Sequence, residues 1–164
     1  MNKAFFTWGT VAVGAAFLIA GLAVMYLGWH NRGEVVSSLV NENLEVADPA
    51  ILLTYEGARA PEGVEVPTVV VDTSQEAHDQ AMVIRTHTLT RTGGLTYSQM
   101  DREDPNRAFY LDSLVLQGSL HQAHVSLEIS LLVIGIGFAF TGLGLSILVL
   151  GVPLVRKVVS LKYR

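Results

Sequence analysis

Two long uncharged runs of apolar residues interrupt an otherwise polar chain. The first extends from Ala4 to Leu27 and the second from Ile129 to Val155. About 24 helical residues, at about 1.5 Å each, reach roughly 36 Å, and the hydrocarbon core of a bilayer is about 30 Å thick. Because backbone groups in lipid must be hydrogen-bonded within their own segment, both runs are predicted to be membrane-spanning helices.

A cleaved signal peptide is the alternative interpretation of the first run, because Met1-Asn2-Lys3 resembles a short charged leader. The apolar region of a signal peptide is typically about 7–15 residues long and ends at a small-x-small cleavage site. This run is longer and ends in Met25-Tyr26-Leu27-Gly28-Trp29, where Tyr26 and Trp29, like Trp8 near the other end, suit a membrane interface. We therefore expect a retained span.

The residues between the two runs predict further helices. Val36, Leu39, Val40 and Leu44 recur at helical spacing, so the first span is expected to continue outward as a helix over Glu34 to about Val46. Asp48-Pro49 can begin a short helix, with Asp48 as N-cap. The stretch from Gly57 to Pro67 holds two glycines and two prolines and is predicted to be irregular.

A capped helix is expected from about Ser74. Thr73 and Glu76 have the spacing of a capping box, and Gly93-Gly94 can end the helix in a left-handed turn. One face of this helix would hold Ala77, Ala81, Ile84 and Thr88. The competing structure is a hairpin, since Thr86, Thr88, Thr90 and Thr92 alternate before Gly93-Gly94.

A second start pattern, Asp104-Pro105, precedes a long region without a helix breaker. It predicts one helix that runs from Asn106 into the second span. The expected fold is thus an all-α membrane protein, with two transmembrane helices extending into a small extracytoplasmic helical domain. The predicted parts are a cytoplasmic tail (1–3), a first span (4–28), the outer domain (29–124), a second span (125–155) and a basic cytoplasmic tail (156–164).

Charge sets the predicted orientation. The segment between the apolar runs holds all fifteen acidic residues, six arginines and no lysine, a net charge of −9. The tails carry only basic side chains, which stay on the cytoplasmic side. We therefore expect a plasma (cytoplasmic) membrane protein with both termini in the cytoplasm. Such an acidic domain argues against nucleic acid as a partner, and the absence of cysteine excludes disulfides and thiolate metal sites.

The middle segment also carries an ordered series of short motifs. They are Val71-Asp72-Thr73 with Glu76-Ala77, then Ile84 and His87, then Gly93-Gly94-Leu95-Thr96-Tyr97-Ser98. This order and the two flanking spans resemble an uncharacterised family of two-span, actinobacterial-type membrane proteins, often labelled "aromatic ring-opening dioxygenase". The resemblance covers most of the chain and implies an outer helical domain and, by that label, non-haem iron chemistry. It assigns no catalytic residue here, and this sequence departs from the family pattern around His121 and His124.

One face of the predicted long helix carries a candidate metal site. Five polar residues lie within an arc of about 80°, beside an apolar stripe: Ser113, Gln117, His121, His124 and Glu128, next to Leu116, Leu120, Ala123 and Leu127. The proposed ligands are His121, His124 and Glu128, as in carboxylate-histidine helix bundles. The fold would have to bring further ligands close, from His78, His87, Glu42 or Asp112. Alternatively, the stripe is the wet or partner-facing side of the helix, with Glu128 at headgroup level.

The second span is rich in small residues. Gly135/Ala139 and Gly142/Ser146 are small-xxx-small pairs, which allow close helix approach in lipid. The first span offers Ala12, Ala16 and Ala20 at the same spacing. The two spans can simply pack on each other, but the small surface exceeds what one pair of helices needs, so other membrane subunits are expected partners beside the lipid.

No common phosphate-loop, hydrolase-elbow, zinc-protease or haem-attachment motif occurs in the sequence. The leading hypothesis is a non-catalytic structural or accessory subunit of a larger membrane assembly, without a cofactor, whose acidic domain docks on or covers a partner. The rival is a metal-binding or redox enzyme component that uses the His121, His124 and Glu128 face. An envelope sensor is a third possibility, which the short tails disfavour.

Overall fold

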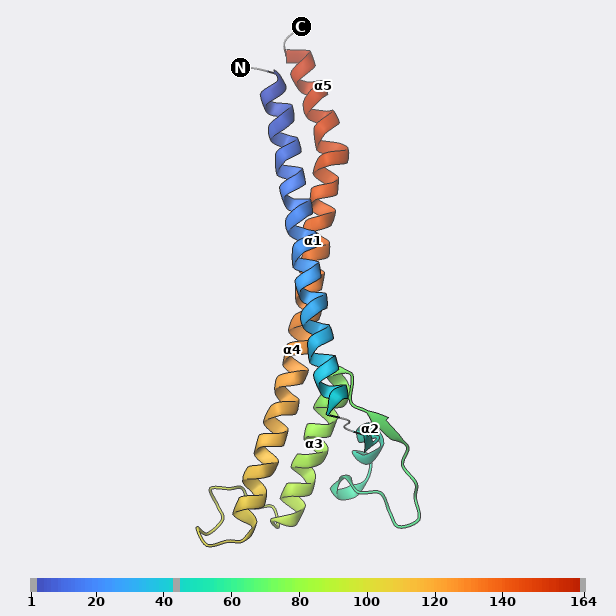
Figure 1. Ribbon diagram of the computed structural model, residues 1–164, viewed down its shortest axis with the longest axis vertical. Coiled ribbons are helices and arrows are strands. Elements are labelled where there is room, and N and C mark those ends of the chain that lie inside the picture. Colours follow the sequence, from blue (N-terminus) through green and yellow to red (C-terminus); the bar gives the residue numbers. More distant parts are fainter. Residues whose placement is uncertain (1–2, 43–44, 163–164) are drawn as a thin grey trace. The chain divides into compact units, whose positions relative to one another are not determined.

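The computed structural model describes residues 3–42 and 45–162, most of which are helical (Figure 1). Their contacts divide into two compact units, one formed by Met1–Arg32 with Ile129–Arg164 and one by Gly33–Glu128. We call them the apolar hairpin and the helical domain. The elements, in order, are α1 (Lys3–Asn41), β1 (Glu45–Ala47), α2 (Pro49–Leu52), η1 (Glu56–Ala58), β2 (Thr68–Val70), α3 (Ser74–Arg91), α4 (Asn106–Ser146), η2 (Ile147–Gly151) and α5 (Val152–Lys162).

In the apolar hairpin, α1 lies antiparallel to the end of α4 and to α5 (Figure 1). The helical stretches Phe5–Asn41 and Asn106–Leu161 are both long and apolar enough to cross a membrane. The sequence prediction of two such helices is confirmed at this level.

Glycines spaced seven residues apart bring the two helices of the hairpin together. A Cβ atom on Gly137 would lie 2.7 Å from the backbone nitrogen of Met25, and one on Gly144 would lie 2.6 Å from that of Leu18. Any side chain at these positions would meet backbone, so the close approach requires glycine. On α1, Gly21 and Gly28 face α4, and Gly14 faces Ile147 and Leu148 of η2.

The helix of the second apolar run changes its hydrogen bonding near its end. Ile147–Gly151 forms a π-helical turn, η2, between α4 and α5. Pro153 follows directly after Val152, and proline neither donates to the carbonyl four residues earlier nor fits beside it. A π turn is a common way to accommodate such a break within a continuous helix.

The core of the helical domain lies between α3 and α4. Its buried residues are Val71, Ala77, Ala81 and Leu120, with Val46, Ile84 and Ala123 packed against them. The alanines present a flat surface on α3, against which Leu120 of α4 can pack. The residues predicted to share one face of α3 are on its inner side, since Ala77, Ala81 and Thr88 are buried and Ile84 packs against the core.

The prediction of a purely helical domain is wrong in one respect. Strands β1 and β2 pair antiparallel, with Val46 opposite Val69. The helix continuing from the first apolar run ends at Asn41 instead of about Val46, because Val46 is needed in extended chain to contact the core. Leu44, which was assigned to that helix, lies outside the described residues, as do Met1, Asn2 and Arg164 of the predicted tails.

The predicted caps are confirmed at α2 and α3. Asp48 accepts hydrogen bonds from the amides of Ala50 and Ile51 at 3.0 and 3.4 Å. At α3, Thr73 Oγ1 accepts from the amide of Glu76 at 3.2 Å, and the Glu76 carboxylate accepts from the amide of Thr73 at 3.0 Å. This is the capping box expected from the sequence.

The end of α3 also follows the sequence. The amide of Gly94 donates to Leu89 O at 2.7 Å and that of Gly93 to Thr90 O at 3.3 Å. Both glycines have positive φ, 63° at Gly93 and 84° at Gly94. These two bonds make a Schellman motif. The alternative of a β-hairpin in this stretch is wrong, because the chain is helical from Ser74 to Arg91. Asp104 then accepts from the amide of Asn106 at 2.8 Å, where α4 begins as predicted.

Candidate functional site

Three imidazole rings meet between α3 and α4. The ring centre of His78 lies 5.0 Å from that of His124 and 5.7 Å from that of His121. His121 and His124 follow each other by one turn of α4, whereas His78 comes from the first half of α3. The structure thus brings His78, one of four possible additional ligands, to the two histidines that the sequence placed on one face. We call these three residues the histidine cluster.

Ser74 connects the histidine cluster to Glu128. Its hydroxyl donates to Glu128 Oε1 at 2.6 Å and lies 2.8 Å from His124 Nδ1, which is also 3.1 Å from the carbonyl oxygen of Ser74. A carbonyl and a carboxylate only accept hydrogen bonds. The serine hydroxyl has one proton, which it gives to Glu128, so His124 Nδ1 must carry the hydrogen that bonds Ser74.

This assignment leaves Nε2 of His124 with a free lone pair whenever the ring is neutral. His78 contributes a second uncommitted nitrogen. Its Nδ1 is buried and has no hydrogen-bond partner within the described residues. Buried polar atoms are usually paired, and one that is not calls for an explanation.

The other proposed ligands lie elsewhere or are already engaged. Glu128 is bonded to Ser74, and His87 Nε2 lies 2.8 Å from Ala58 O, away from the cluster on α3. Asp112 precedes His121 by nine residues, which places it about half a turn around α4. Glu42 is exposed near the end of α1. Among the described residues, no three His, Asp or Glu side chains are arranged to hold one metal ion.

The rest of the polar stripe on α4 is part of the domain's packing. Ser113 and Gln117 are only 4% and 7% exposed, and the Ser113 hydroxyl donates to Phe109 O at 2.9 Å. The solvent-facing interpretation is therefore wrong for these two residues. Conversely, Leu116 of the predicted apolar stripe is exposed, because the side of α4 that is buried is centred between the two stripes.

Ser74 was not singled out by the sequence analysis. Ser74 and His78 are separated by four residues, so they share one face of α3, next to Ala77 and Ala81. That spacing could have identified both as facing α4. The partner residues on α4 could not be identified, because pairing between distant helices is not encoded in local spacing.

Electrostatics at the start of α3 favour a charged Glu76. Partial burial tends to raise the pKa of this carboxyl group, but hydrogen bonds from Thr73 and from the amides of Asp72 and Thr73 outweigh it and lower the pKa below its ordinary value of 4.5. A carboxylate at this position also interacts favourably with the helix dipole. These interactions stabilise the start of α3, which positions Ser74.

In the apolar hairpin, the predicted small-residue surface is not used between the two helices. All four of its residues are exposed on α4: Gly135, Ala139, Gly142 and Ser146. A Cβ atom on Gly135 or Gly142 would meet nothing within 4 Å apart from its own stretch of helix. Ala12, Ala16 and Ala20 of α1 are exposed as well.

The helical domain has an exposed apolar surface of its own. Outside the buried side of α4, which holds Ser113, Gln117 and Leu120, four large apolar side chains are exposed, and Val115 is 69% exposed. They are Leu111, Leu114, Val115 and Val125. We call these four residues the outward face of α4.

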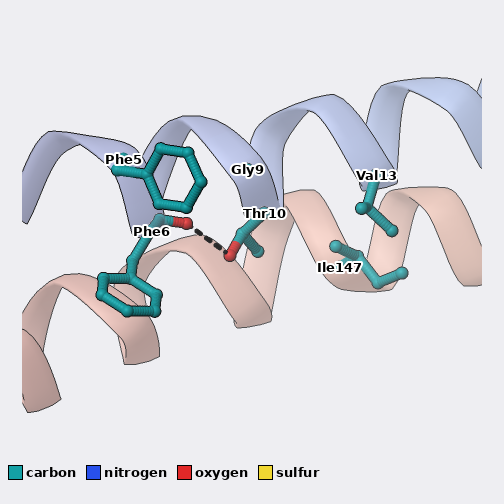
Figure 2. A pocket seen from close by; sticks show the side chains of 6 residues that line it. All are labelled: Phe5, Phe6, Gly9, Thr10, Val13 and Ile147. Carbon is teal, nitrogen blue, oxygen red and sulfur yellow. Dashed lines mark hydrogen bonds between the residues drawn. The ribbon is translucent and has the colours of Figure 1, made fainter.

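Two open depressions lie on the apolar hairpin. One is lined by Phe5, Phe6, Gly9, Thr10, Val13 and Ile147 (Figure 2). Its polar side chain, Thr10, donates its hydroxyl to Phe6 O at 2.9 Å, so the lining is suited to hydrocarbon more than to a polar ligand. The other is lined by Leu22, Met25, Tyr26, Trp29 and His30.

Comparison of the chain with known protein families, with curated proteins and with solved structures finds no match. The resemblance to the two-span family stays a prediction.

Proposed function

We propose that this protein is a non-catalytic accessory subunit of a larger membrane assembly, and that Gly135, Ala139, Gly142 and Ser146 bind a helix of its partner. The observation that carries the proposal is that the hairpin packs through a different set of glycines. The four small residues remain exposed, with open space at Gly135 and Gly142.

Insertion into a bilayer is supported by the aromatic residues of α1. Trp8 and Trp29 are 70% and 68% exposed and 21 residues apart, which corresponds to about 31 Å along a helix. This separation equals the thickness of a hydrocarbon core, about 30 Å, and tryptophan favours both of its interfaces. We therefore place the apolar hairpin in the plasma membrane, where lipid surrounds it.

The proposed orientation follows from charge. The basic residues Arg156 and Lys157 lie beyond the second apolar run, and all acidic residues lie between the two runs. The positive-inside rule then puts both termini in the cytoplasm and the helical domain outside the cell membrane.

A partner helix explains the small residues better than lipid does. Lipid tails surround large apolar side chains as well as small ones, so lipid contact gives no reason for small residues at one face. Helix association in membranes depends on backbones that can approach closely, which small side chains allow. The Ser146 hydroxyl already donates to Gly142 O at 2.8 Å, so an apolar partner helix leaves no donor unsatisfied there.

The outward face of α4 supports a partner for the helical domain. Leu111, Leu114 and Val115 of this face precede residue 125, where the second span is predicted to begin, and large apolar side chains exposed to water commonly mark a protein interface. We propose that the partner subunit covers this face and that the acidic surface around it remains in solvent.

The test is copurification from native membranes after gentle solubilisation. Gly142→Leu should lose the partner, because its side chain fills the space that the partner helix needs. Gly9→Leu is the matched control, since a side chain at Gly9 also enters open space but lies on α1. A single sharp monomer peak for the wild-type protein, with no protein copurifying, would contradict the proposal.

The alternative function, a metal-binding or redox component of a membrane enzyme, has the histidine cluster in its favour. Elemental analysis of protein purified without chelator separates the two functions. Stoichiometric iron, copper or zinc that disappears in His121→Ala, in a protein with which no partner copurifies, would favour the alternative.

A further inference from the structure

We propose that His78 and His124 form a two-histidine binding site for a divalent transition-metal ion such as Zn²⁺ or Cu²⁺. Water and the exposed imidazole of His121 complete the coordination, and Ser74 and Glu128 act as positioning residues. The proposal replaces Glu128 of the sequence-based ligand set with His78. It is independent of the partner proposed for the apolar hairpin.

The spacing of the rings suits a shared ion. Imidazole nitrogens bind Zn²⁺ at about 2.0–2.1 Å, and two imidazoles on one tetrahedral ion then have ring centres roughly 5 Å apart. The centres of His78 and His124 are 5.0 Å apart, and those of His78 and His121 5.7 Å. The first pair already has the required separation. His121 is exposed and can turn about its side-chain bonds to bring a nitrogen to the ion.

The hydrogen bonding of His124 prepares its other nitrogen for coordination. Metal-bound histidines commonly donate their second ring N–H to a carbonyl or carboxylate, which fixes the tautomer and makes the ligand more basic. Here Nδ1 of His124 donates to Ser74, whose hydroxyl donates in turn to Glu128. The carboxylate therefore acts on the imidazole through one hydroxyl, and Nε2 keeps the lone pair that a cation needs.

His78 offers a ligand that has no other use in the domain. Its Nδ1 is buried and finds no hydrogen-bond partner among residues 3–42 and 45–162, which costs free energy in the absence of a ligand. Coordination through this nitrogen would supply the missing partner. Gln80 Oε1, which is also buried and unpaired among the described residues, is an amide oxygen and a weaker ligand for ions of this class.

The identity of the donors sets the class of ion. Two or three neutral imidazoles without a directly bound carboxylate suit Zn²⁺, Cu²⁺ or Ni²⁺, whereas Mg²⁺ and Ca²⁺ prefer oxygen ligands. The site holds two imidazole rings whose centres are suitably spaced, and no three His, Asp or Glu side chains of the described residues form a ready metal site. Binding is thus expected to draw His121 in.

Isothermal titration calorimetry tests the site on full-length protein in lipid nanodiscs after chelator treatment. Zn²⁺ should bind with a stoichiometry of one to the wild-type protein, and Cu²⁺ should give an electron paramagnetic resonance spectrum with nitrogen couplings from more than one imidazole. His78→Ala and His124→Ala should each abolish stoichiometric binding. His30→Ala, a histidine of the apolar hairpin, is the control and should bind as the wild type does.

The positioning residues give a second readout. Glu128→Gln should weaken Zn²⁺ binding by about 10–100-fold without changing the stoichiometry, as is usual for residues that orient a metal-bound histidine. If circular dichroism shows that His78→Ala does not fold, His78→Gln is used in its place. The Cu²⁺ electron paramagnetic resonance spectrum of His78→Gln should then lack the coupling to one imidazole nitrogen. Absence of stoichiometric binding to the wild type, or full binding to the His78/His124 double variant, would overturn the proposal.

Discussion

Gly21 faces the backbone of Thr141 so closely that a Cβ atom on Gly21 would lie 2.5 Å from the Thr141 nitrogen. Side chains essentially never approach a backbone atom this closely. The two helices of the apolar hairpin are therefore in direct backbone contact at this point, and the contact depends on the absence of a side chain.

Gly21→Leu should separate the two helices of the apolar hairpin, because the leucine must displace backbone instead of a flexible side chain. The chain has no cysteine, so an introduced pair reports on the packing without background. A Cβ atom on Gly151 would lie 3.6 Å from Thr10 Cγ2, so side chains at these two positions contact each other, as a disulfide requires. Thr10→Cys with Gly151→Cys should oxidise readily and resist maleimide labelling.

Adding Gly21→Leu to this cysteine pair should abolish the disulfide. Gly142→Leu is the matched control, since it places the same side chain on the same hairpin in open space, and the disulfide should then form as before. Equal oxidation of both variants would show that the glycine contact does not hold the helices together.

A seven-residue spacing of glycines in the sequence indicates this contact, but the four-residue spacing of Gly135/Ala139 and Gly142/Ser146 is the more familiar pattern for helix packing in membranes. Gly14, Gly21 and Gly28 are spaced by seven, as are Gly137 and Gly144. A seven-residue repeat keeps one seam toward a single partner helix. Several small faces were available in the sequence, and only the rotation of each helix about its axis decides which of them meet. That rotation depends on non-local packing.

Ser74→Ala should weaken the contact between the first turn of α3 and the stretch of α4 that holds His124 and Glu128. The variant removes the hydrogen bonds of the hydroxyl to Glu128 and His124, and the bond to the Ser74 carbonyl remains. A loss of about 1 kcal/mol in the free energy of unfolding is expected. Thermal unfolding followed by circular dichroism should show a lower midpoint, whereas Ser98→Ala in the exposed loop should leave it unchanged.

The start of α3 was predictable because the capping box is local, with all of its groups between Asp72 and Glu76. The histidine cluster was predictable only in part. His121 and His124 share a face by helical periodicity, but His78 lies more than forty residues earlier, and nothing in the local sequence pairs the two segments. The β1–β2 pairing escaped prediction for the same reason, since strands of three residues carry little pattern.

Gly93→Ala and Gly118→Ala should change stability in opposite directions. Gly93 has a φ of 63° in the Schellman motif, where a Cβ is strained, so alanine should destabilise the domain by about 1 kcal/mol. Gly118 lies in regular helix on the exposed side of α4 with open space around it, where alanine should stabilise by up to about 1 kcal/mol. Unfolding midpoints of the purified variants measure both. A loss of stability in Gly118→Ala would indicate that this side of α4 is already covered.

Glu76→Gln should remove a pH-dependent part of the stability of the helical domain. The hydrogen bonds from Thr73 and Asp72 lower the pKa of Glu76 below its ordinary value of 4.5 despite the opposing effect of burial. The folded state therefore favours the ionised carboxylate relative to the unfolded state. The resulting stabilisation is complete above the unfolded-state pKa and is lost as the pH falls through the folded-state pKa.

The difference in free energy of unfolding between the wild type and Glu76→Gln should thus be largest near neutral pH and shrink as the pH falls below 4.5. Glutamine keeps an oxygen for the amides of Asp72 and Thr73 but loses the charge, so part of the cap survives. Hydrogen exchange of the first amides of α3 between pH 3 and pH 7, corrected for the intrinsic rate, measures the effect. Glu62→Gln in the exposed loop is the control, and a difference for Glu76→Gln that does not vary with pH would contradict the role assigned to its charge.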